Sequence, residues 1–367
     1  MKSEQAKSLT KSLTKQLNQF DVTKCAWAAS ATVALFGLSV GSAFAQACTS
    51  PPPFCPASSS AGDTLIDSQK ASPASRTLVF SSMGLISQTI VGRLAAPGSA
   101  RTAGLNVGTG MAAAAQGSPW STWAAVGYNA VGYNFAPLAS SGSVNNALLG
   151  IDYGLSNGAL VGVVMGIDST NISTSFNGGS VGVTGYTVTP YFAVPIGSNL
   201  TLDGSLGVGS GNVNANIGGG VSGSTDESRS FGSLALTYTM NVEKWQIQGV
   251  GSLLSSSTSQ RQLTLSNAQT VASTNSGSTQ LRVGFRANYG SGDFIPFMGL
   301  SVSSDLSSTN TQAVGGQNPA NAKTAVYLLA GVSIKPGQKI SGSVQLNSEV
   351  RNQVRNNGVT GTVSFKF

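Results

Sequence analysis

Residues 359–367 read Val-Thr-Gly-Thr-Val-Ser-Phe-Lys-Phe and end the chain. Apolar residues and glycine alternate here with polar residues, which is the period-2 pattern of a β-strand. An apolar face that ends in an aromatic residue suits a strand with lipid on one side and a wet lumen on the other. An ordinary edge strand of a soluble protein is the alternative. The apolar face carries Val359, Gly361, Val363, Phe365 and Phe367, and the polar face carries Thr360, Thr362, Ser364 and Lys366.

The composition of the whole chain favours the lipid-facing interpretation. The chain has 367 residues, of which only 9% are charged, and its mean hydropathy is +0.10. Beyond residue 45 no uncharged apolar run reaches the roughly 20 residues that a membrane-spanning helix needs. Together with 46 glycines, this predicts a membrane β-barrel with a polar interior. A secreted Ser/Gly-rich β-solenoid is the competing class, but no repeat of fixed period is present.

The first 45 residues are predicted to be a signal peptide. Five lysines and two acidic residues precede an uncharged stretch, and Ala43, Ala45 and Gln46 mark a small-x-small cleavage site. An uncleaved membrane anchor is the alternative. Cleavage removes those seven charges and lowers the net charge from +7 to +4. We expect an exported protein of this charge to meet anionic lipid headgroups or solutes and no nucleic acid.

Residues 46–72, rich in Pro, Ser and Ala, are predicted to form a short flexible exported tail. Export places its cysteines in an oxidising compartment. A disulfide between Cys48 and Cys55 would close a small loop, which three prolines stiffen. Lipidation of Cys48 is the alternative, although Gln46 matches a lipobox poorly.

A helix is predicted over residues 73–96. Ser72-Pro73 supplies an N-cap and a first-turn proline, and Pro97-Gly98 supplies a stop signal. Such a helix is about 36 Å long, enough to cross a bilayer core of about 30 Å. A surface amphipathic helix or a small docking helix is the alternative. The residues that define the helix are Val79, Met83, Ile86, Ile90, Arg93 and Leu94.

From Trp120 to Phe367 the sequence predicts an all-β domain of twelve antiparallel strands. Tight-turn signals such as Asn157-Gly158 and Pro336-Gly337 alternate with longer polar connectors. An even number of strands joined in this way is the pattern of a transmembrane β-barrel. The expected strands are 120–135, 144–156, 159–175, 180–196, 199–216, 225–242, 244–265, 275–290, 293–308, 322–335, 338–350 and 353–367.

The side chains of these strands are expected to divide between lipid and lumen. An arginine facing lipid at mid-bilayer would cost about 2–4 kcal/mol, so the face of each strand that carries the charged residues must point into the lumen. Pro190 and Pro296 are expected to mark bulges, since proline lacks a ladder donor. Aromatic girdles are expected from Trp120, Tyr128, Tyr153, Tyr191, Trp245 and Tyr289. The expected lumen charges are Asp152, Asp203, Arg282, Arg286, Glu349 and Lys366. These charges either set ion selectivity or, as we favour, pair with one another and with Arg76 and Arg93.

The order of signal, tail, helix, barrel and terminal Phe367 resembles the C-terminal translocator domain of type V secretion autotransporters. The resemblance covers roughly residues 74–367 and rests on 85–94, 120–127, 186–192 and 363–367. It implies a helix inside the pore and a passenger passed to the cell surface. The ending, with Val363, Phe365 and Phe367, also resembles the signal by which outer-membrane barrels are handed to the barrel-assembly machinery, with periplasmic chaperones as further partners.

Two features depart from the family pattern. Family passengers are usually hundreds of residues long, whereas only residues 46–72 are available here. No Asn-Asn pair lies in residues 73–96, so self-cleavage on the linker helix is not expected. The leading hypothesis is an outer-membrane translocator that anchors a very short passenger at the cell surface. The alternative is a stand-alone outer-membrane channel or structural barrel without a passenger, and a soluble exported β-sandwich is a third possibility.

No catalytic site, metal site or cofactor is expected. The chain contains no histidine, which excludes Ser-His-Asp hydrolysis and histidine-based zinc sites. The glycines near residues 108 and 209 lack the following Lys-Ser/Thr and helix of a phosphate-binding loop. The sequence therefore predicts a non-enzymatic monomeric barrel in the lipid of the bacterial outer membrane.

Overall fold

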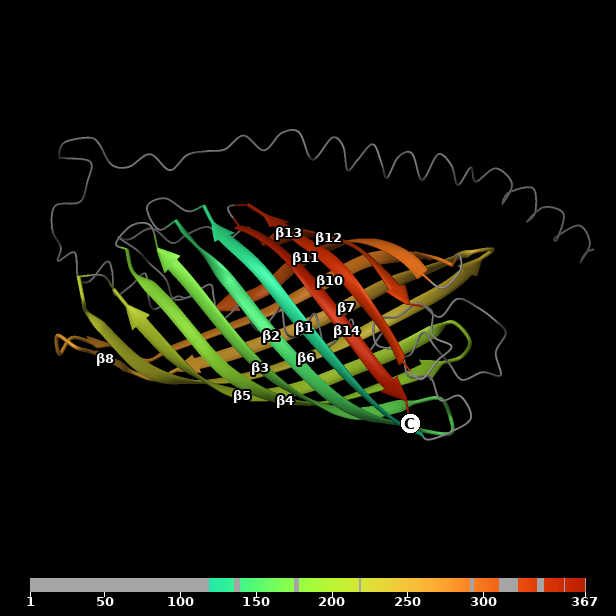
Figure 1. The fold of residues 1–367 in the computed structure, drawn as a ribbon, viewed down its shortest axis with the longest axis horizontal. Coiled ribbons are helices and arrows are strands. Elements are labelled where there is room, and N and C mark those ends of the chain that lie inside the picture. Colours follow the sequence, from blue (N-terminus) through green and yellow to red (C-terminus); the bar gives the residue numbers. More distant parts are fainter. Residues whose placement is uncertain are drawn as a thin grey trace, which may run out of the picture. The chain divides into compact units, whose positions relative to one another are not determined.

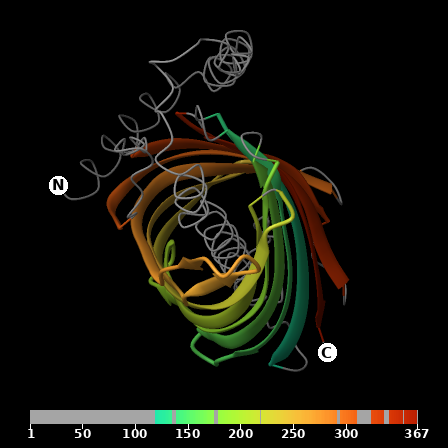
Figure 2. The same ribbon diagram turned by 90° about the vertical axis from the view of Figure 1, so that its left-hand side faces the viewer.

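The computed structural model describes residues 119–134, 139–174, 178–217, 219–290, 294–309, 323–334, 340–352 and 354–366. The predicted signal peptide, the cysteine-containing tail, the helix over 73–96 and Phe367 lie outside these ranges. The described residues form one closed β-barrel (Figures 1 and 2).

Twelve long antiparallel strands make the wall, as the sequence predicts. Neighbours along the chain pair with each other, β14 pairs with β1, and β7 pairs with β10, which closes the ring. The described residues form fourteen strands, of which all but the short β8 and β9 belong to the wall: β1 (Trp120–Tyr133), β2 (Ser140–Gly154), β3 (Leu160–Thr174), β4 (Ser180–Ile196), β5 (Leu200–Asn216), β6 (Ser222–Val242), β7 (Trp245–Gln260), β8 (Leu263–Leu265), β9 (Thr270–Val271), β10 (Thr274–Tyr289), β11 (Phe294–Thr309), β12 (Thr324–Ile334), β13 (Ile340–Arg351) and β14 (Val354–Lys366).

The short hairpin of β8 and β9 was not predicted. Residues 263–265 were expected to continue the seventh strand, and 270–271 were expected to lie in a loop. Instead β8 leaves β7 and pairs with β6, where Gly223 lies opposite Leu265. This pairing lets the hairpin bury its apolar side chains, because Leu263 and Leu265 pack with Ala215 near the end of β5 and with Ile217 just beyond it.

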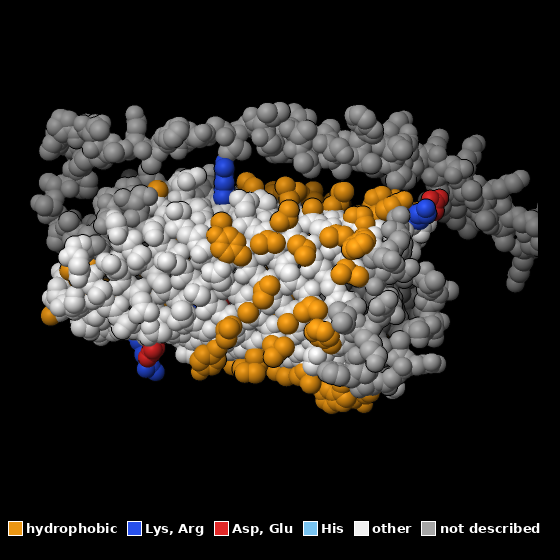
Figure 3. Space-filling view, viewed as in Figure 1, with side chains coloured by type: hydrophobic (Ala, Val, Ile, Leu, Met, Phe, Trp, Pro, Cys, Tyr) orange, Lys and Arg blue, Asp and Glu red, His pale blue; other side chains and the backbone are white. Residues whose placement is uncertain are grey.

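Outward-facing side chains form an apolar band around one part of the barrel. In Figure 3 the hydrophobic side chains gather on the half nearer the chain's C-terminus, and the other half is almost free of them. The band includes Leu149, Ile167, Leu206, Val283 and Leu346, whose side chains are exposed although they are large and apolar. Exposure of so many such side chains on one face is the mark of a surface that meets lipid.

Beyond this band the arrangement is the opposite: polar side chains point outward and apolar side chains point into the barrel. Within the band on β5, Leu206 is 72% exposed and Ser205 is buried. Further along the same strand Asn212 and Asn214 are exposed, and Val213 is buried against Val181 and Val183. The reversal indicates that the end of the barrel formed by residues 210–230 stands in water with a small core of its own. The connection 261–273 lies at this end, and so do Thr309 at the end of β11 and Thr324 at the start of β12.

The aromatic girdle is partly as predicted. Trp120 contacts Tyr153 with ring centroids 5.0 Å apart, and Trp245 contacts Tyr289 at 4.8 Å. Both pairs lie at the end of the barrel that carries the short turns. Tyr191 was wrongly placed in the girdle, because it has the opposite parity from its exposed neighbours and is buried inside the barrel.

The two prolines were wrongly predicted to mark bulges. On β4 the register with β5 is the same before and after Pro190, so the ladder is interrupted without an inserted residue. Pro296 precedes Phe297, where the pairing of β11 with β10 begins, so its nitrogen faces no partner strand on that side. The register shift falls instead between Thr279 and Gln280.

The boundary of the apolar band can be tested with arginine. Leu206→Arg should lower the free energy of unfolding in lipid vesicles by about 2–4 kcal/mol, because the charge would face hydrocarbon. Asn214→Arg is the matched control on the same strand and should change it by less than about 0.5 kcal/mol. Equal effects of the two changes in a denaturant titration would place the boundary elsewhere.

Candidate functional site

The interior wall of the barrel is the candidate functional site, and it is lined by polar side chains. Asp152 and Asp203 are buried there. Arg282, Arg286 and Glu349 are half-buried and also lie on the inward-facing sides of their strands. The remaining predicted lumen charge, Lys366, pairs through its backbone with Ser121, and its side chain is outside the described set.

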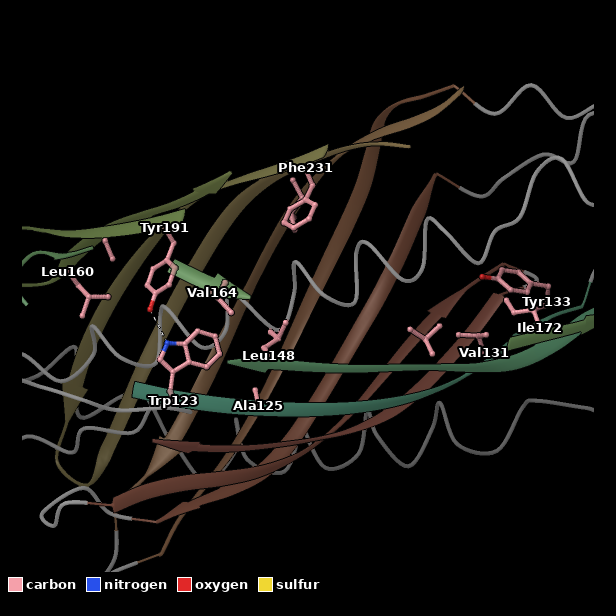
Figure 4. Close-up of a cluster of buried hydrophobic side chains, with 13 residues drawn as sticks. Trp123, Ala125, Val131, Tyr133, Leu148, Leu160, Val164, Ile172, Tyr191 and Phe231 are labelled. Atoms are coloured by element: carbon pink, nitrogen blue, oxygen red, sulfur yellow. Dashed lines mark hydrogen bonds between the residues drawn. The ribbon is translucent and has the colours of Figure 1, made fainter. Parts of the chain in front are cut away.

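A first network joins β1, β2 and β4 near the short-turn end. The indole Nε1–H of Trp123 donates to the hydroxyl of Tyr191 at 2.9 Å (Figure 4). That hydroxyl donates to Asp152 Oδ2 at 2.7 Å, and Ser121 donates to the other carboxylate oxygen. The carboxylate of Asp152 on β2 is therefore hydrogen-bonded to side chains from two other strands, β1 and β4.

Glycines on the middle strands make room for this network. Trp123 lies opposite Gly150 of β2, and a Cβ atom at Gly150 would overlap the indole ring. A Cβ atom at Gly162 of β3 would lie 2.5 Å from Cζ of Tyr191. The two large side chains thus lie over backbone that has no side chain, which brings β1 and β4 into contact across two strands.

A second network is a buried ion cluster between β3 and β6. The Nη1 group of Arg229 donates to both carboxylate oxygens of Asp168, at 2.8 and 2.7 Å. Its Nε–H donates to Glu227 on the same strand. The Arg229 side chain has no exposed surface, and those of Asp168 and Glu227 are 3% and 1% exposed. Because the three charges lie out of water, each depends on the others for compensation.

A third network joins β10, β11 and β13. Arg351 donates to Asp305 at 2.6 Å and lies 3.5 Å from Glu349. Gln280 donates to Asp305 at 3.0 Å and accepts from Arg282 at 3.1 Å. Among the predicted lumen charges, Glu349 forms an ion pair, but its partner Arg351 was not one of them.

Sequence reasoning missed the centres of the second and third networks. Asp168, Glu227, Arg229, Asp305 and Arg351 were not among the predicted lumen residues. One signal was available, because Glu227 and Arg229 stand two residues apart and so share a face of a strand. The partners Asp168 and Asp305 lie 61 and 46 residues away along the chain from their arginines, and no local pattern joins them.

The described residues contain no group of three or more metal-ligating side chains that could hold an ion. Within the same residues the structure has no helix that is long and apolar enough to cross a membrane.

Residues 117–347 match the family model described as the autotransporter beta-domain. A comparison with curated protein sequences gives no match. Among solved structures, the translocator domain of the autotransporter NalP from Neisseria meningitidis is 13% identical with a TM-score of 0.57. That match covers 69% of this chain and 90% of NalP's.

Two further translocator structures are similar. The beta domain of the Bordetella autotransporter BrkA is 18% identical with a TM-score of 0.58, covering 68% of this chain and all of its own. The transport unit of AIDA-I from Escherichia coli is 13% identical with a TM-score of 0.50, covering 67% and 90%. At these identities the structures support the fold, and the family rests on the sequence model. The chain belongs to the autotransporter beta-domain family, whose barrels are outer-membrane translocators.

Proposed function

We propose that this barrel carries residues 46–72 through its lumen and anchors them at the cell surface, without catalysing a reaction. The observation that supports the proposal is where β1 begins. Ser121 pairs with Lys366 near the C-terminus, and the carbonyl of Pro119 accepts from Gly154 beside the turn at 155–159. Pro119, the first described residue, therefore lies at the short-turn end of the barrel, where β1 starts (Figure 1).

The position of that junction makes the lumen the route to the outside. Short turns of outer-membrane barrels face the periplasm, and longer loops face outward. A tail that reaches the surface from a periplasmic junction must pass through the barrel, since lipid surrounds its outside. Eight strands leave an interior that side chains just fill, so twelve leave additional space, and here that space has polar walls.

An epitope inserted after Ser60 tests this directly. We expect external protease to remove the epitope on intact cells, because residue 60 lies in the proposed passenger. The measurement is loss of the epitope on an immunoblot while the barrel stays whole. Protection on intact cells, with digestion after permeabilisation, would leave the tail in the periplasm and favour a stand-alone channel or structural barrel.

Two further insertions serve as controls for orientation. An epitope within 310–323, the longest connection, should be cut on intact cells, and one at Ser291 in the turn between β10 and β11 should be protected. The reverse pattern would overturn the orientation, and with it the route through the lumen.

We also propose that the last strand presents the assembly signal. Phe365 faces outward and is 43% exposed, on the same parity as Val363 and Phe367. An exposed apolar strand end can add to an open sheet edge during assembly, which suits recognition by barrel-assembly machinery.

A further inference from the structure

The β8–β9 hairpin, residues 263–271, is joined to the barrel wall through a break on each of its two legs. Residues 261–262 follow β7 and residues 272–273 precede β10, and neither pair belongs to a strand. The register between the two legs is the same below the breaks and above them, so the breaks lie at one level. Paired breaks at one level allow the hairpin to bend away from the line of β7 and β10 as one piece.

The hairpin lies across the mouth of the barrel. Figure 1 places β8 at the end opposite the C-terminus, and Figure 2, which looks onto that end, shows the hairpin crossing the opening. Its side chains Leu263, Leu265 and Val271 are buried against Ala215 and Ile217 at the rim beside β5. The hairpin therefore covers part of the lumen at the end that carries the longer connections.

Few backbone contacts hold the hairpin to the wall. β8 pairs with β6 at two positions, Gly223 with Leu265 and Ser224 with Thr264, and β9 pairs only with β8 among the described strands. The backbone N–H of Ser266 adds one bond to β6 at 2.8 Å. The wall strands, by contrast, pair with neighbours on both sides along most of their length. A segment held by so few bonds opens at a lower free energy than the wall does.

The contacts with β6 differ between the break and the hairpin beyond it. The hydroxyl of Thr225 donates to the carbonyls of residues 261–262, at 3.3 and 3.0 Å, which ties the first break to the wall. Beyond the break the hairpin approaches so closely that a Cβ atom at Gly223 would lie 2.5 Å from the carbonyl oxygen of Thr264 and 2.9 Å from Cδ1 of Leu263. The break is therefore a fixed point, and the closed position beyond it depends on a glycine.

We propose that the β8–β9 hairpin is a flap that turns about residues 261–262 and uncovers the mouth while the twelve-stranded wall stays folded. In the closed position the flap buries its apolar cluster with the rim of β5, which excludes water from these side chains. In the open position the cluster meets water, which keeps the open population small, and the mouth is wider. The flap does not depend on whether the barrel carries a passenger.

A thiol placed beneath the flap reports its opening. The three native cysteines are replaced by serine, Ala215→Cys is introduced, and the full chain folded in detergent is treated with a maleimide. Ala215 is only 4% exposed, so we expect its thiol to react each time the flap opens. The matched control is Val183→Cys, which is buried in a separate cluster with Val181 and Val213 and should react at least about tenfold more slowly. Equal rates for the two thiols would overturn the proposal.

Two further changes shift the flap in opposite directions. An oxidised Ser224→Cys/Thr264→Cys pair locks it shut, since directly opposed residues of antiparallel strands have Cα atoms about 4.5–5.5 Å apart, within the range of a disulfide. The lock should slow the labelling of Ala215→Cys at least about tenfold. Gly223→Ala should speed it by about tenfold, because the added Cβ pushes against the hairpin backbone. Gly182→Ala is the matched control and should change nothing, since a Cβ there meets no atom nearer than 3.8 Å.

Folding of every variant is checked by the shift in gel mobility between unheated and boiled samples, and the disulfide by the mass of the unlabelled protein. If Gly223→Ala fails to fold, the locked variant still decides the question. An unchanged labelling rate in the locked protein would mean that the reagent reaches residue 215 by another route. That result would overturn the flap, and so would faster labelling on locking.

Discussion

Replacing Gly150 by leucine is expected to abolish the folded barrel. The inward face of Gly150 lies beneath the indole ring of Trp123, and even one added carbon would overlap that ring. The ring cannot swing aside without losing its hydrogen bond to Tyr191 and, through it, to Asp152. Ordinary overpacking costs about 1–3 kcal/mol, and a leucine here must also break this network, so the loss should exceed that range.

The readout for Gly150→Leu is the fraction of protein that keeps the mobility of the folded barrel in SDS without heating. Gly132→Leu is the matched control on β1, since a Cβ atom there meets no atom within 4 Å, and it should fold normally. The double variant Trp123→Ala/Gly150→Leu should recover part of the folded fraction, because the leucine then occupies the space of the ring. A normal folded fraction for Gly150→Leu alone would contradict the packing described above.

Replacing Arg229 by methionine is expected to lower the free energy of unfolding by about 3–5 kcal/mol. The change keeps much of the side-chain volume and removes the cation that Asp168 and Glu227 share. Two buried carboxylates would then lie close together without it, and their repulsion adds to the cost of their burial. Denaturant titration in detergent measures the loss.

Two companion variants separate this charge effect from packing. Arg261→Met removes an arginine from an exposed pair with Asp226, at 3.8 Å, and should cost less than about 1 kcal/mol. Asp168→Asn/Glu227→Gln/Arg229→Met removes all three charges and should be more stable than Arg229→Met alone. If the triple variant were the less stable of the two, buried charge would not be the cause.

Strand positions and facing could be predicted because they depend on a local signal. On β10 every second residue, such as Leu281, Val283 and Phe285, must meet lipid, and the residues between them must meet the lumen. The alternation of apolar and polar residues can therefore be recognised in the sequence. The same rule places Tyr191 correctly, since the exposed Pro190 and Phe192 flank it. Its assignment to the girdle rested on nearness to a strand end, which says nothing about facing.

The sequence by itself determined the barrel class, the twelve strands and the inward facing of Asp152, Asp203, Arg282, Arg286 and Glu349, since neighbouring residues carry those signals. Only the tertiary structure decided which inward side chains meet. Trp123 and Tyr191 are 68 residues apart, and Arg229 of β6 reaches Asp168 of β3 across two intervening strands of the chain. Such contacts depend on the register between strands and on the curvature that closure imposes, and neither is a property of any one segment. The same closure leaves Arg282 and Arg286 without carboxylates while it gives partners to Arg229 and Arg351.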